Sequence, residues 1–476
     1  MTFTSFTFVL FFLIFFAIYW SFKNQLRIQN YLILAGSYLF YGWWDYRFLA
    51  LIFASSMIDY TIGLMIYKSN KQKIRNLLMG ICLLTNLGML FYFKYYNFFI
   101  DSFSDLLSSM DIDSTNLYIH VILPVGISFY TFQTLSYSLD IYKKRLTPTT
   151  NLVDFLGFVS FFPQLVAGPI ERASMLLPQI SKPRVFNYDL AVSGARLVLY
   201  GFFKKLVIAD PLSLRVTPIF SNPEGFSSIE TIIGGMLFLI QLYLDFSAYS
   251  DIAIGTGRIL GFNLMKNFDV PLSATSIPEF WRRWHISLTT WFRDYLFLPV
   301  VKLRINNFLW RLFSTIMLFV VIGIWHGANM TFVCFGFIVG LCYTPTLLAK
   351  DFAWLKNGIK FINTNVFVKP FTWALNFIIM SLIIVLFRVE NMDMAGRYYQ
   401  NILFAEDFWQ IDEFIHRIFP LVIGFLVFEY YMRKKMYCFD ISGWPGWLRH
   451  TTYLGMIISI LLYGYFAEEP FYYFQF

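Results

Sequence analysis

Long apolar segments, recurring from one end of the chain to the other, constrain this sequence more than any other feature. Residues 47–67, 76–93 and 371–387 each approach the length that a membrane helix needs, roughly 20 apolar residues for a bilayer core of about 30 Å. A membrane-spanning backbone must satisfy its own hydrogen bonds, which leaves helices or a closed barrel. Because the apolar positions are continuous and do not alternate with polar ones, we predict helices.

The apolar runs together predict an all-α integral membrane protein with about eleven to thirteen membrane segments, in a single domain covering residues 1–476. Some runs are short and are expected to be tilted or re-entrant. The first run lacks a basic leader and a cleavage site, so we expect a permanent span. The runs lie near residues 2–20, 30–43, 47–67, 76–93, 117–140, 152–168, 190–208, 229–262, 309–325, 329–349, 371–387, 417–432 and 450–466.

Composition excludes an ordinary soluble protein and gives no sign of a metal centre. Hydrophobic residues make up 58% of the chain and charged residues only 14%, whereas a soluble domain carries about a quarter charged residues. The four cysteines lie in or beside apolar segments without metal-ligand spacing, so we interpret them as packing residues. They are Cys82, Cys334, Cys342 and Cys438.

Charges in the loops predict the orientation of the chain, because Lys and Arg concentrate in cytoplasmic loops. The basic stretches 68–75, 143–145 and 433–435 are therefore predicted to be cytoplasmic. The acidic stretches are predicted to be external, which places both termini outside. They are the loop 97–116 (Asp101, Asp105, Asp111, Asp113), the loop 388–413, and the tail with Glu468 and Glu469. The net charge of +8 is then a topology signal, and it does not indicate nucleic-acid binding.

Residues 279–311 combine tryptophans with arginines. This pattern is typical of an amphipathic helix at a membrane interface, with rings at the headgroup level and cations among the phosphates. We predict that this stretch lies on the cytoplasmic side. His285 lies in it, and two interpretations stay open for this residue: a headgroup-level side chain, or a residue with a functional role.

A second histidine, His326, stands in the apolar sequence FVVIGIWHGANMTFVCF at 319–335. The apolar segment begins near Phe313, so a helix would carry His326 roughly 20 Å from the cytoplasmic side. Gly327 and Asn329 favour a break in the helix directly afterwards. Intramembrane ionisable residues suggest function, and histidine transfers protons near neutral pH. The alternative is a core histidine bonded to a backbone carbonyl.

A polar island interrupts the apolar run at 241–258, where Asp245, Tyr249 and Asp251 occur. Carboxylates at such depth must be neutralised, paired or hydrated. They either line a polar cavity or bond neighbouring helices to one another, and the sequence leaves both interpretations open. Prolines and a glycine in FFPQLVAGPIER at 161–172 predict a broken helix.

Six ordered blocks resemble the membrane-bound O-acyltransferase (MBOAT) family, and within it the bacterial alginate O-acetyltransferase AlgI-like branch. The resemblance covers nearly the whole chain. The blocks are YLFYGWWD (38–45), FFPQLVAGPI (161–170), YLDFSAYSDIAIG (243–255), EFWRRWHISLTTWFRDYLFLPV (279–300), GIWHGANMTF (323–332) and PFYYFQF (470–476).

The resemblance implies a ring of helices around a central tunnel, with His326 as the catalytic histidine and His285 as the second histidine of the family. It implies an O-acetyltransferase of the bacterial inner membrane that moves acetyl groups from cytoplasmic acetyl-CoA toward an extracytoplasmic polysaccharide such as alginate. Acetyl-CoA is then a substrate, and no bound cofactor is implied. An SGNH-type partner protein outside the membrane is implied as well. For the donor's phosphates we expect Arg282, Arg283, Arg293 and Trp284 at the inner mouth. Asp245, Tyr249, Asp251 and Asn329 are expected to line the cavity.

Two alternatives remain open at this point. One is the D-alanyl-transfer branch of the same family, in which a carrier protein delivers the acyl group to teichoic acid. The other is a transporter or channel with a proton relay through His326 and the two aspartates, Asp245 and Asp251. Transporters of this kind are often built from paired repeats, and the sequence has no such symmetry.

Overall fold

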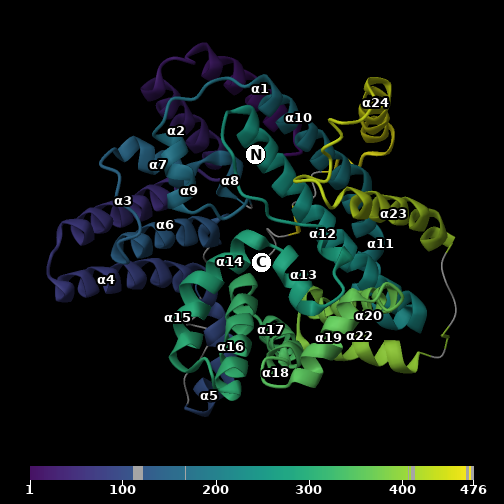
Figure 1. Ribbon diagram of the computed structural model, residues 1–476. Helices are drawn as coiled ribbons and strands as arrows, with labels where there is room; N and C mark the ends of the chain where they lie inside the picture. Colours follow the sequence, from purple (N-terminus) through teal and green to yellow (C-terminus); the bar gives the residue numbers. More distant parts are fainter. Residues whose placement is uncertain are drawn as a thin grey trace. The chain divides into compact units, whose positions relative to one another are not determined.

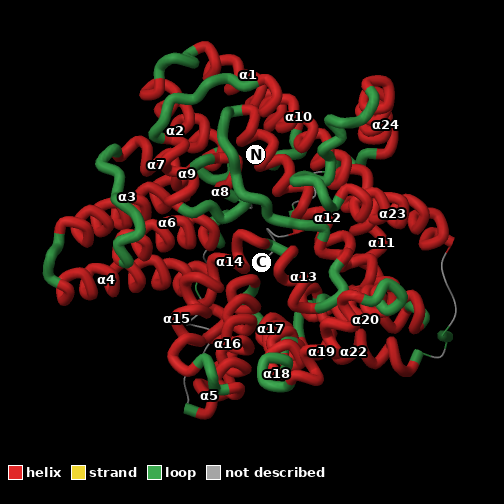
Figure 2. Tube along the Cα trace, viewed as in Figure 1, coloured by secondary structure: helices red, strands yellow, loops and turns green. Residues whose placement is uncertain are grey.

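The computed structural model describes residues 1–110, 119, 122–166, 168–405, 407–408, 413–467 and 471–472. These residues form helices joined by loops, with no strand among them (Figure 2). The prediction of an all-α protein is therefore confirmed. Parts of the predicted external segments lie outside the described residues, namely Asp111, Asp113, Glu468, Glu469 and most of the block 470–476.

Six helices in the described part of the chain are long and apolar enough to cross a membrane. They span Arg47–Lys68, Gln72–Asp101, Ser228–Ile259, Phe308–His326, Met330–Leu348 and Lys369–Arg388. Two shorter apolar helices cover Phe6–Ser21 and Pro420–Met432. The polytopic membrane architecture is thus confirmed. Other predicted runs fall on shorter helices, for which length alone does not decide a crossing.

The chain forms two compact units, and unit 1 contains Met1–Ala195 together with Ala253–Met265. Helix α6 lies at its centre, almost entirely buried against α3 and α4. The predicted break at 161–172 is present, because a loop separates α8 from α9. The elements of unit 1 (Figure 1) are α1 (Phe6–Ser21), α2 (Leu26–Gly42), α3 (Arg47–Lys68), α4 (Gln72–Leu90), η1 (Phe91–Tyr95), α5 (Tyr96–Ser109), α6 (Ile127–Tyr142), α7 (Leu152–Ser160), α8 (Phe162–Leu165) and α9 (Ala173–Ile180).

Unit 2 contains Arg196–Ile252 and Lys266–Phe476, so the boundary falls within α10 (Tyr188–Phe203) and α12 (Ser228–Ile259). The predicted single domain, ring and tunnel depend on how the units join and stay predictions. The other elements of unit 2 are η3 (Lys204–Ala209), α11 (Asp210–Ser221), η4 (Pro223–Gly225), η5 (Pro271–Ser273), α13 (Ile277–Arg283), α14 (Ile286–Phe292), η6 (Arg293–Phe297), α15 (Leu298–Val301), η7 (Lys302–Arg304), α16 (Phe308–His326), α17 (Met330–Cys342), α18 (Thr344–Leu348), α19 (Ala353–Thr364), α20 (Lys369–Ile383), α21 (Val385–Arg388), α22 (Met392–Phe404), α23 (Glu413–Met432) and α24 (Gly446–Tyr463).

The stretch 279–311 is not one amphipathic interfacial helix, and that prediction is wrong. It forms a series of short helices from α13 to η7 and then the start of the long α16, with a sharp turn at His285, whose φ of 42° is left-handed. The rings of Trp281 and Trp284 are buried, and they pack on Phe280, Phe319 and Phe268. Burying these large rings against other aromatic side chains removes more apolar surface from water than resting them at the headgroups. The aromatic residues therefore form core.

Helices α16 and α17 form a tight hairpin in unit 2. A Cβ atom on Gly323 would overlap the carbonyl of Phe332, and one on Gly336 would overlap the carbonyl of Phe319. Small residues let membrane helices approach this closely. The turn between the helices follows the sequence prediction, because α16 ends at His326 and Asn329 caps α17 by accepting from the backbone N–H of Thr331 (3.1 Å). The hairpin fixes where the last residue of α16 lies.

Candidate active site

His326 is the last residue of α16, and its side chain is 5% exposed. Its ring contacts the neighbouring Trp325 (centroids 4.8 Å apart) and Phe387 of α21 (4.9 Å). The end of α16 and these aromatic rings therefore fix where the imidazole of His326 lies.

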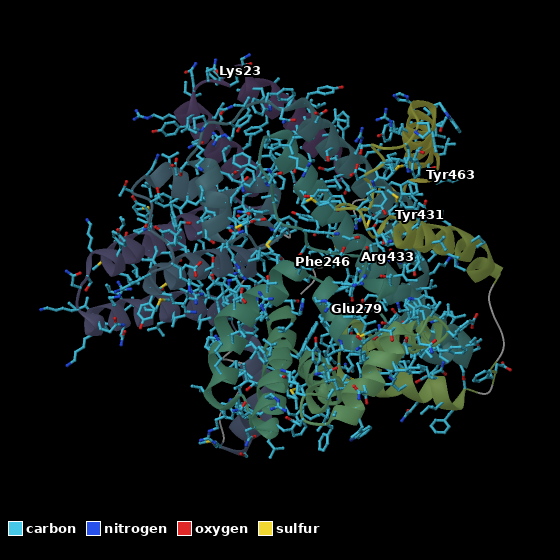
Figure 3. The ribbon with its side chains drawn as sticks, in the orientation of Figure 1. Lys23, Phe246, Glu279, Tyr431, Arg433 and Tyr463 are labelled. Atoms are coloured by element: carbon cyan, nitrogen blue, oxygen red, sulfur yellow. The ribbon has the colours of Figure 1, made fainter. Side chains whose placement is uncertain are left out.

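His285 is buried, with 1% of its surface exposed, so the headgroup-level interpretation is wrong. Its ring meets the ring of Phe246 of α12 edge to face, with centroids 4.7 Å apart (Figure 3 labels Phe246). The turn between α13 and α14 carries His285 inward because Trp281 and Trp284, on either side of α13's end, are themselves buried. His285, which the sequence predicts at the membrane interface, thus lies in the protein interior.

Asn267 orients the imidazole of His285. The Nδ1 atom of His285 lies 3.1 Å from Oδ1 of Asn267, which also accepts from the hydroxyl of Ser287 (2.9 Å). The amide nitrogen of Asn267 in turn donates to Ser250 (3.1 Å). Because an amide oxygen only accepts, Nδ1 carries the proton and Nε2 has the lone pair. Burial lowers the pKa of His285 to about 3, so the ring is neutral at physiological pH.

The two histidines are neighbours within unit 2, where their ring centroids lie 6.5 Å apart. The sequence predicts them well separated, with His285 at the cytoplasmic side and His326 deeper, and this separation is wrong. A centroid distance of 6.5 Å is longer than that of two directly hydrogen-bonded imidazoles. The inward turn at His285 is the physical reason for their proximity.

His326 faces a small enclosed space that we call the His326 cavity. Its volume is about 10 Å³, which is near the minimum that holds one water molecule. Aromatic side chains make up most of its wall, so an acyl group can enter only if these rings move. The cavity is lined by Leu242, Phe246, Trp281, Trp284, His326, Phe335, Ile384 and Phe387.

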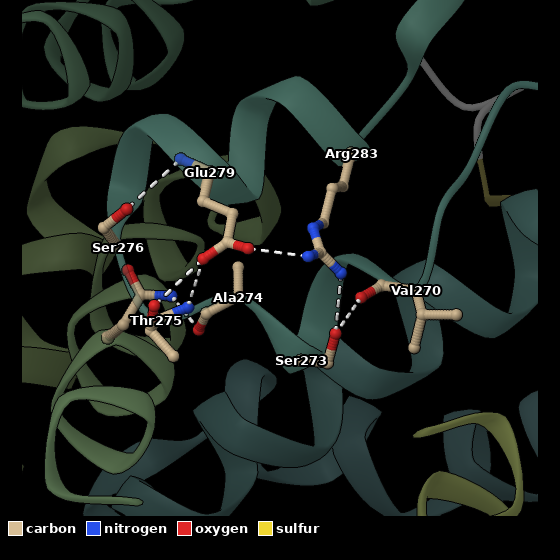
Figure 4. Close-up of polar contacts among 8 residues, drawn as sticks. Val270, Ser273, Ala274, Thr275, Ser276, Glu279 and Arg283 are labelled. Atoms are coloured by element: carbon tan, nitrogen blue, oxygen red, sulfur yellow. Dashed lines mark hydrogen bonds and ion pairs between the residues drawn. The ribbon is translucent and has the colours of Figure 1, made fainter. Parts of the chain in front are cut away.

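The four predicted donor residues lie in different surroundings. Trp284 lines the His326 cavity, whereas Arg282 is exposed and has no ion pair among the described residues. Arg283 pairs with Glu279 of α13 (2.6 Å) and donates to Ser273 (3.0 Å), as Figure 4 shows. Burial acts to raise the pKa of Glu279, but bonds from Thr275 and Arg283 hold it below its ordinary value.

Arg293, the remaining predicted donor residue, pairs with its neighbour Asp294 (2.7 Å). Of the three arginines, only Arg282 has its charge unengaged by a carboxylate in the described structure. An exposed, unengaged guanidinium is the most available to an external phosphate.

The polar island separates into two parts. Asp251 pairs with the buried Lys204 (2.6 Å), which also donates to Ser247 (2.8 Å). Tyr249 is buried against Phe471 (centroids 4.7 Å apart). These contacts bond α12 to η3 and to the C-terminal segment, which fits the packing interpretation. Asn329, predicted as a cavity residue, caps α17 and donates from its amide to the carbonyl of Glu390.

Asp245 lines a larger space, which we call the polar pocket, with a volume of about 440 Å³. Its carboxylate accepts from the buried Lys205 (2.6 Å) and from the backbone N–H of Tyr472 (2.9 Å). The second carboxylate on Lys205 is Asp210 (2.7 Å). The pocket is lined by Lys205, Asp210, Ser213, Leu214, Thr217, Pro218, Gln241, Asp245, Arg388 and Tyr472.

A third space of about 590 Å³ is mostly apolar, and we call it the apolar pocket. The helical span Lys369–Arg388, made of α20 and α21, contributes to its wall and to that of the His326 cavity. Along this span the apolar pocket comes first, lined by Trp373 and Phe377. The His326 cavity follows, lined by Ile384 and Phe387. The polar pocket comes last, lined by Arg388. The apolar pocket is lined by Val270, Leu272, Ser273, Thr275, Val366, Lys369, Pro370, Trp373, Phe377, Ile423, Leu426, Val427 and Tyr430.

Comparison with known proteins decides the family. The profile of the membrane-bound O-acyltransferase family, MBOAT, matches residues 38–389. This chain belongs to the membrane-bound O-acyltransferase family. The O-acyltransferase is 35% identical over the whole of both chains to the probable alginate O-acetylase AlgI of Pseudomonas putida. It is 39% identical to the protein of that name in Pseudomonas syringae pv. tomato, over 87% of this chain and 77% of the relative.

A third relative is the peptidoglycan O-acetyltransferase of Helicobacter pylori, which is 29% identical over 95% of this chain and 92% of its own. The prediction of an acyltransferase enzyme is therefore confirmed. The predicted localisation as a multi-pass protein of the bacterial inner membrane is confirmed too, by the apolar helices and the family.

Some polar residues around the site of this O-acyltransferase escaped prediction from the sequence. Two lysines, Lys204 and Lys205, interrupt the apolar run 190–208, and Glu429 interrupts the run 417–432. The carboxylate of Glu429 accepts hydrogen bonds from the hydroxyls of Tyr200 (2.9 Å) and Tyr243 (2.8 Å). The signal was available, because a charged residue inside an apolar run needs a partner at the same depth. Pairing Lys204 with Asp251 and Lys205 with Asp245 required the folded structure.

Proposed function

We propose that this O-acyltransferase moves acetyl groups from cytoplasmic acetyl-CoA to an extracytoplasmic polysaccharide such as alginate. Support for the acetyl group and for the polymer comes from the relatives, whose names specify alginate O-acetylase and peptidoglycan O-acetyltransferase. The high coverage of these relatives supports the same reaction class for this chain. Acetyl-CoA is a substrate in this proposal and leaves as free CoA.

One observation carries the proposal: His326 faces a cavity that lies between the apolar pocket and the polar pocket along α20 and α21. The charge pattern predicts that the basic residues 350–369 and 433–435, at the ends of the helices around the apolar pocket, are cytoplasmic. The acidic loop 388–413, which begins at the polar pocket, is predicted to be external. A donor would then arrive from one side of His326 and an acceptor from the other.

In the proposed step His326 is the general base. The acceptor hydroxyl attacks the thioester carbonyl carbon, so that a C–O bond forms and the C–S bond breaks. The hydroxyl proton passes to His326 and then to the departing sulfur, which leaves as a thiol. The alternative, in which His326 carries the acetyl group transiently, uses the same residue and the same net reaction.

The neighbouring His285 has a different part in the proposal. As a neutral ring with its Nδ1–H held by Asn267, it presents Nε2 as a hydrogen-bond acceptor in an aromatic environment. It would position the attacking hydroxyl or a water molecule beside His326. Arg282 is the arginine best placed to attract the phosphates of the donor, because its charge is not engaged.

The rings around the His326 cavity form the expected gate. Phe387 and Trp281 close a space that is too small for an acetyl group, so one or both would swing away when the donor binds. A closed resting state keeps water from the thioester and limits wasteful hydrolysis. On the external side an SGNH-type partner protein is the proposed recipient that completes delivery to the polymer.

The test uses purified protein in proteoliposomes, with acetyl-CoA labelled in the acetyl group and a hydroxyl acceptor. The His326→Ala variant should transfer acetyl about 10²–10⁴-fold more slowly than the wild type. His450→Ala, at an exposed histidine of α24, is the matched control and should stay active. Full activity in His326→Ala at normal protein levels would exclude His326 as the central residue.

The same preparation separates the alternatives. If acetyl-CoA supports no transfer and a carrier-protein thioester is required, the result would favour D-alanyl transfer over acetyl transfer. Solute or proton flux in the absence of any acyl donor would favour a transporter. Neither result is expected.

A further inference from the structure

Three helices of unit 1 bring a set of polar side chains together in its interior, which we call the Asp59 cluster. Each helix contributes two residues one turn apart, and side chains at positions i and i+4 lie on one face of a helix. Because α3, α4 and α6 pack against one another (Figure 1), the three faces meet. Each side chain of the cluster is at most 1% exposed. The members are Ser55 and Asp59 of α3, Cys82 and Asn86 of α4, and Thr134 and Ser138 of α6.

The carboxyl group of Asp59 is surrounded by hydrogen-bond donors. Its Oδ1 accepts from the amide nitrogen of Asn86 (2.9 Å) and from the thiol of Cys82 (3.1 Å). Its Oδ2 accepts from the same amide nitrogen (3.1 Å). A protonated carboxyl group would donate one hydrogen bond itself, whereas an ionised one only accepts. These contacts are therefore the ones that a carboxylate anion makes.

The negative charge of Asp59 has no positive side chain beside it. Asp59 lies within the apolar span Arg47–Lys68, and no described lysine, arginine or histidine pairs with its carboxylate. By contrast, Asp245 and Asp251 of α12 each lie 2.6 Å from a lysine ammonium. A charge inside a membrane protein is costly unless an opposite charge lies next to it. The Asp59 cluster thus needs a positive charge that its described neighbours do not supply.

The cluster also contains hydroxyl groups whose bonding capacity is unused. The hydroxyls of Ser55 and Ser138 make no hydrogen bond among the described residues. A serine in a helix can donate to the carbonyl four residues earlier, as Ser56 does to Ile52 (2.6 Å). The hydroxyl of Ser138 lies instead beside the thiol of Cys82. Because an unpaired buried polar atom costs free energy, these two oxygen atoms are available to coordinate a cation.

We propose that the Asp59 cluster is a binding site for a sodium ion. One carboxylate balances one positive charge, which suits a monovalent cation better than Mg²⁺ or Ca²⁺. Carboxylate, amide and hydroxyl oxygens are the ligands that hard cations prefer. The proposed ligands are the carboxylate of Asp59 and the hydroxyls of Ser55, Thr134 and Ser138. The amide of Asn86 turns over when the ion binds, so that Oδ1 takes the place of Nδ2 beside the carboxylate.

The surroundings of Asn86 allow its amide to turn. Its Oδ1 accepts from the hydroxyl of Thr134 (3.3 Å), which lies 3.2 Å from the carbonyl of Thr131 as well. After the turn, Nδ2 donates to the oxygen of Thr134, whose proton goes to Thr131, so both side chains keep a partner. A bound ion would join α3, α4 and α6 at one point and stabilise their packing. Sequence spacing does not reveal such a site, because its ligands come from separate helices and most are hydroxyls.

Thermal unfolding of the purified protein in detergent tests the inference. At constant ionic strength, NaCl should raise the thermal midpoint of the wild type by about 2–4 °C relative to KCl or choline chloride. In Asp59→Asn the midpoint should be the same in all three salts, because the charge that holds the ion is gone. Ser138→Ala keeps this charge but loses one ligand, so it should need about tenfold more Na⁺ for the same rise.

The matched control is Asp154→Asn, at another buried aspartate of unit 1. Its carboxylate also accepts from an amide, that of Asn30 (2.8 Å), and from a hydroxyl, that of Ser181 (2.9 Å). Asp154 does not belong to the Asp59 cluster, so Asp154→Asn should keep the effect of sodium even if its midpoint is lower in every salt.

Equilibrium binding of radioactive Na⁺ to the protein in lipid nanodiscs gives a second measurement, which does not depend on stability. The wild type and Asp154→Asn should bind one ion per chain, and Asp59→Asn should bind none. Equal midpoints of the wild type in NaCl and choline chloride, with no bound Na⁺, would overturn the inference. Sodium binding that persists in Asp59→Asn would overturn it too, and potassium as effective as sodium would overturn the choice of ion.

Discussion

The rings of His285 and His326 lie 6.5 Å apart between centroids, although one belongs to the turn between α13 and α14 and the other ends α16. The ring of Phe246 packs edge to face with His285, and that of Phe387 does so with His326, so both imidazoles are shielded by aromatic rings. Within this pair His285 is neutral and oriented by Asn267, while His326 is the last residue of α16. The two imidazoles therefore have different surroundings.

Loss of the amide that orients His285 should slow the reaction. In Asn267→Ala the Nδ1–H of His285 loses its acceptor, and the neutral tautomer is no longer fixed. We expect kcat to fall about five- to tenfold, the equivalent of one net hydrogen bond of about 1 kcal/mol. The KM for the donor should change little. Ser250→Ala is the control, because it removes only the bond that the amide nitrogen of Asn267 donates and leaves Oδ1 in place. Unchanged kcat in Asn267→Ala would contradict this role.

The buried neutral state of His285 predicts sensitivity to acid. Its pKa is about 3 in the folded protein and 6.5 when unperturbed, so the unfolded chain binds one more proton between these values. The free energy of unfolding therefore falls as pH drops below 6.5, by about 1.4 kcal/mol per pH unit at most. Between pH 7.5 and 5.5 the thermal midpoint should fall further in wild type than in His285→Gln. An equal fall of the thermal midpoint in the two proteins would exclude a contribution of His285 to acid sensitivity.

The close approach of α16 and α17 predicts that Gly336 tolerates no larger side chain. A Cβ there meets the backbone of Phe319 and Val320, so Gly336→Ala must push the helices apart and should cost about 1–3 kcal/mol. Activity should fall with stability, because the hairpin positions His326. Gly424→Ala, in α23 with open space around the added atom, should be neutral or stabilising. Melting curves in detergent compare the two variants.

Two adjacent arginines should respond differently to replacement. Arg282→Ala removes an exposed, unengaged cation, so we expect KM for acetyl-CoA to rise about fivefold and the effect to shrink at high salt. Arg283→Ala breaks the contacts with Glu279 and Ser273 shown in Figure 4 and should chiefly lower stability. Steady-state kinetics at two salt concentrations, together with melting curves, separate these effects. A larger rise in KM for Arg283→Ala would reverse the assignment.

Local features of the sequence were sufficient for the helices and for several of their boundaries. The apolar run at 309–325 and the residues Gly327 and Asn329 predicted the end of α16 and the start of α17, because both depend on neighbours within a few residues. Asp245 and Asp251 stood out for the same reason, as carboxylates inside an apolar run. Their partners Lys205 and Lys204 did not follow, since they come from another helix.

By itself the sequence determined that this chain crosses a membrane as helices, resembles the membrane-bound O-acyltransferases and carries a titratable residue at a helix break. Only the tertiary structure decided that Trp281, Trp284 and His285 turn inward, that His285 lies beside His326, and that Asp245 and Arg388 line one pocket. The reason is physical. An aromatic and basic stretch has two places to bury its rings, the headgroup layer or a protein core, and only the partners supplied by distant helices select between them.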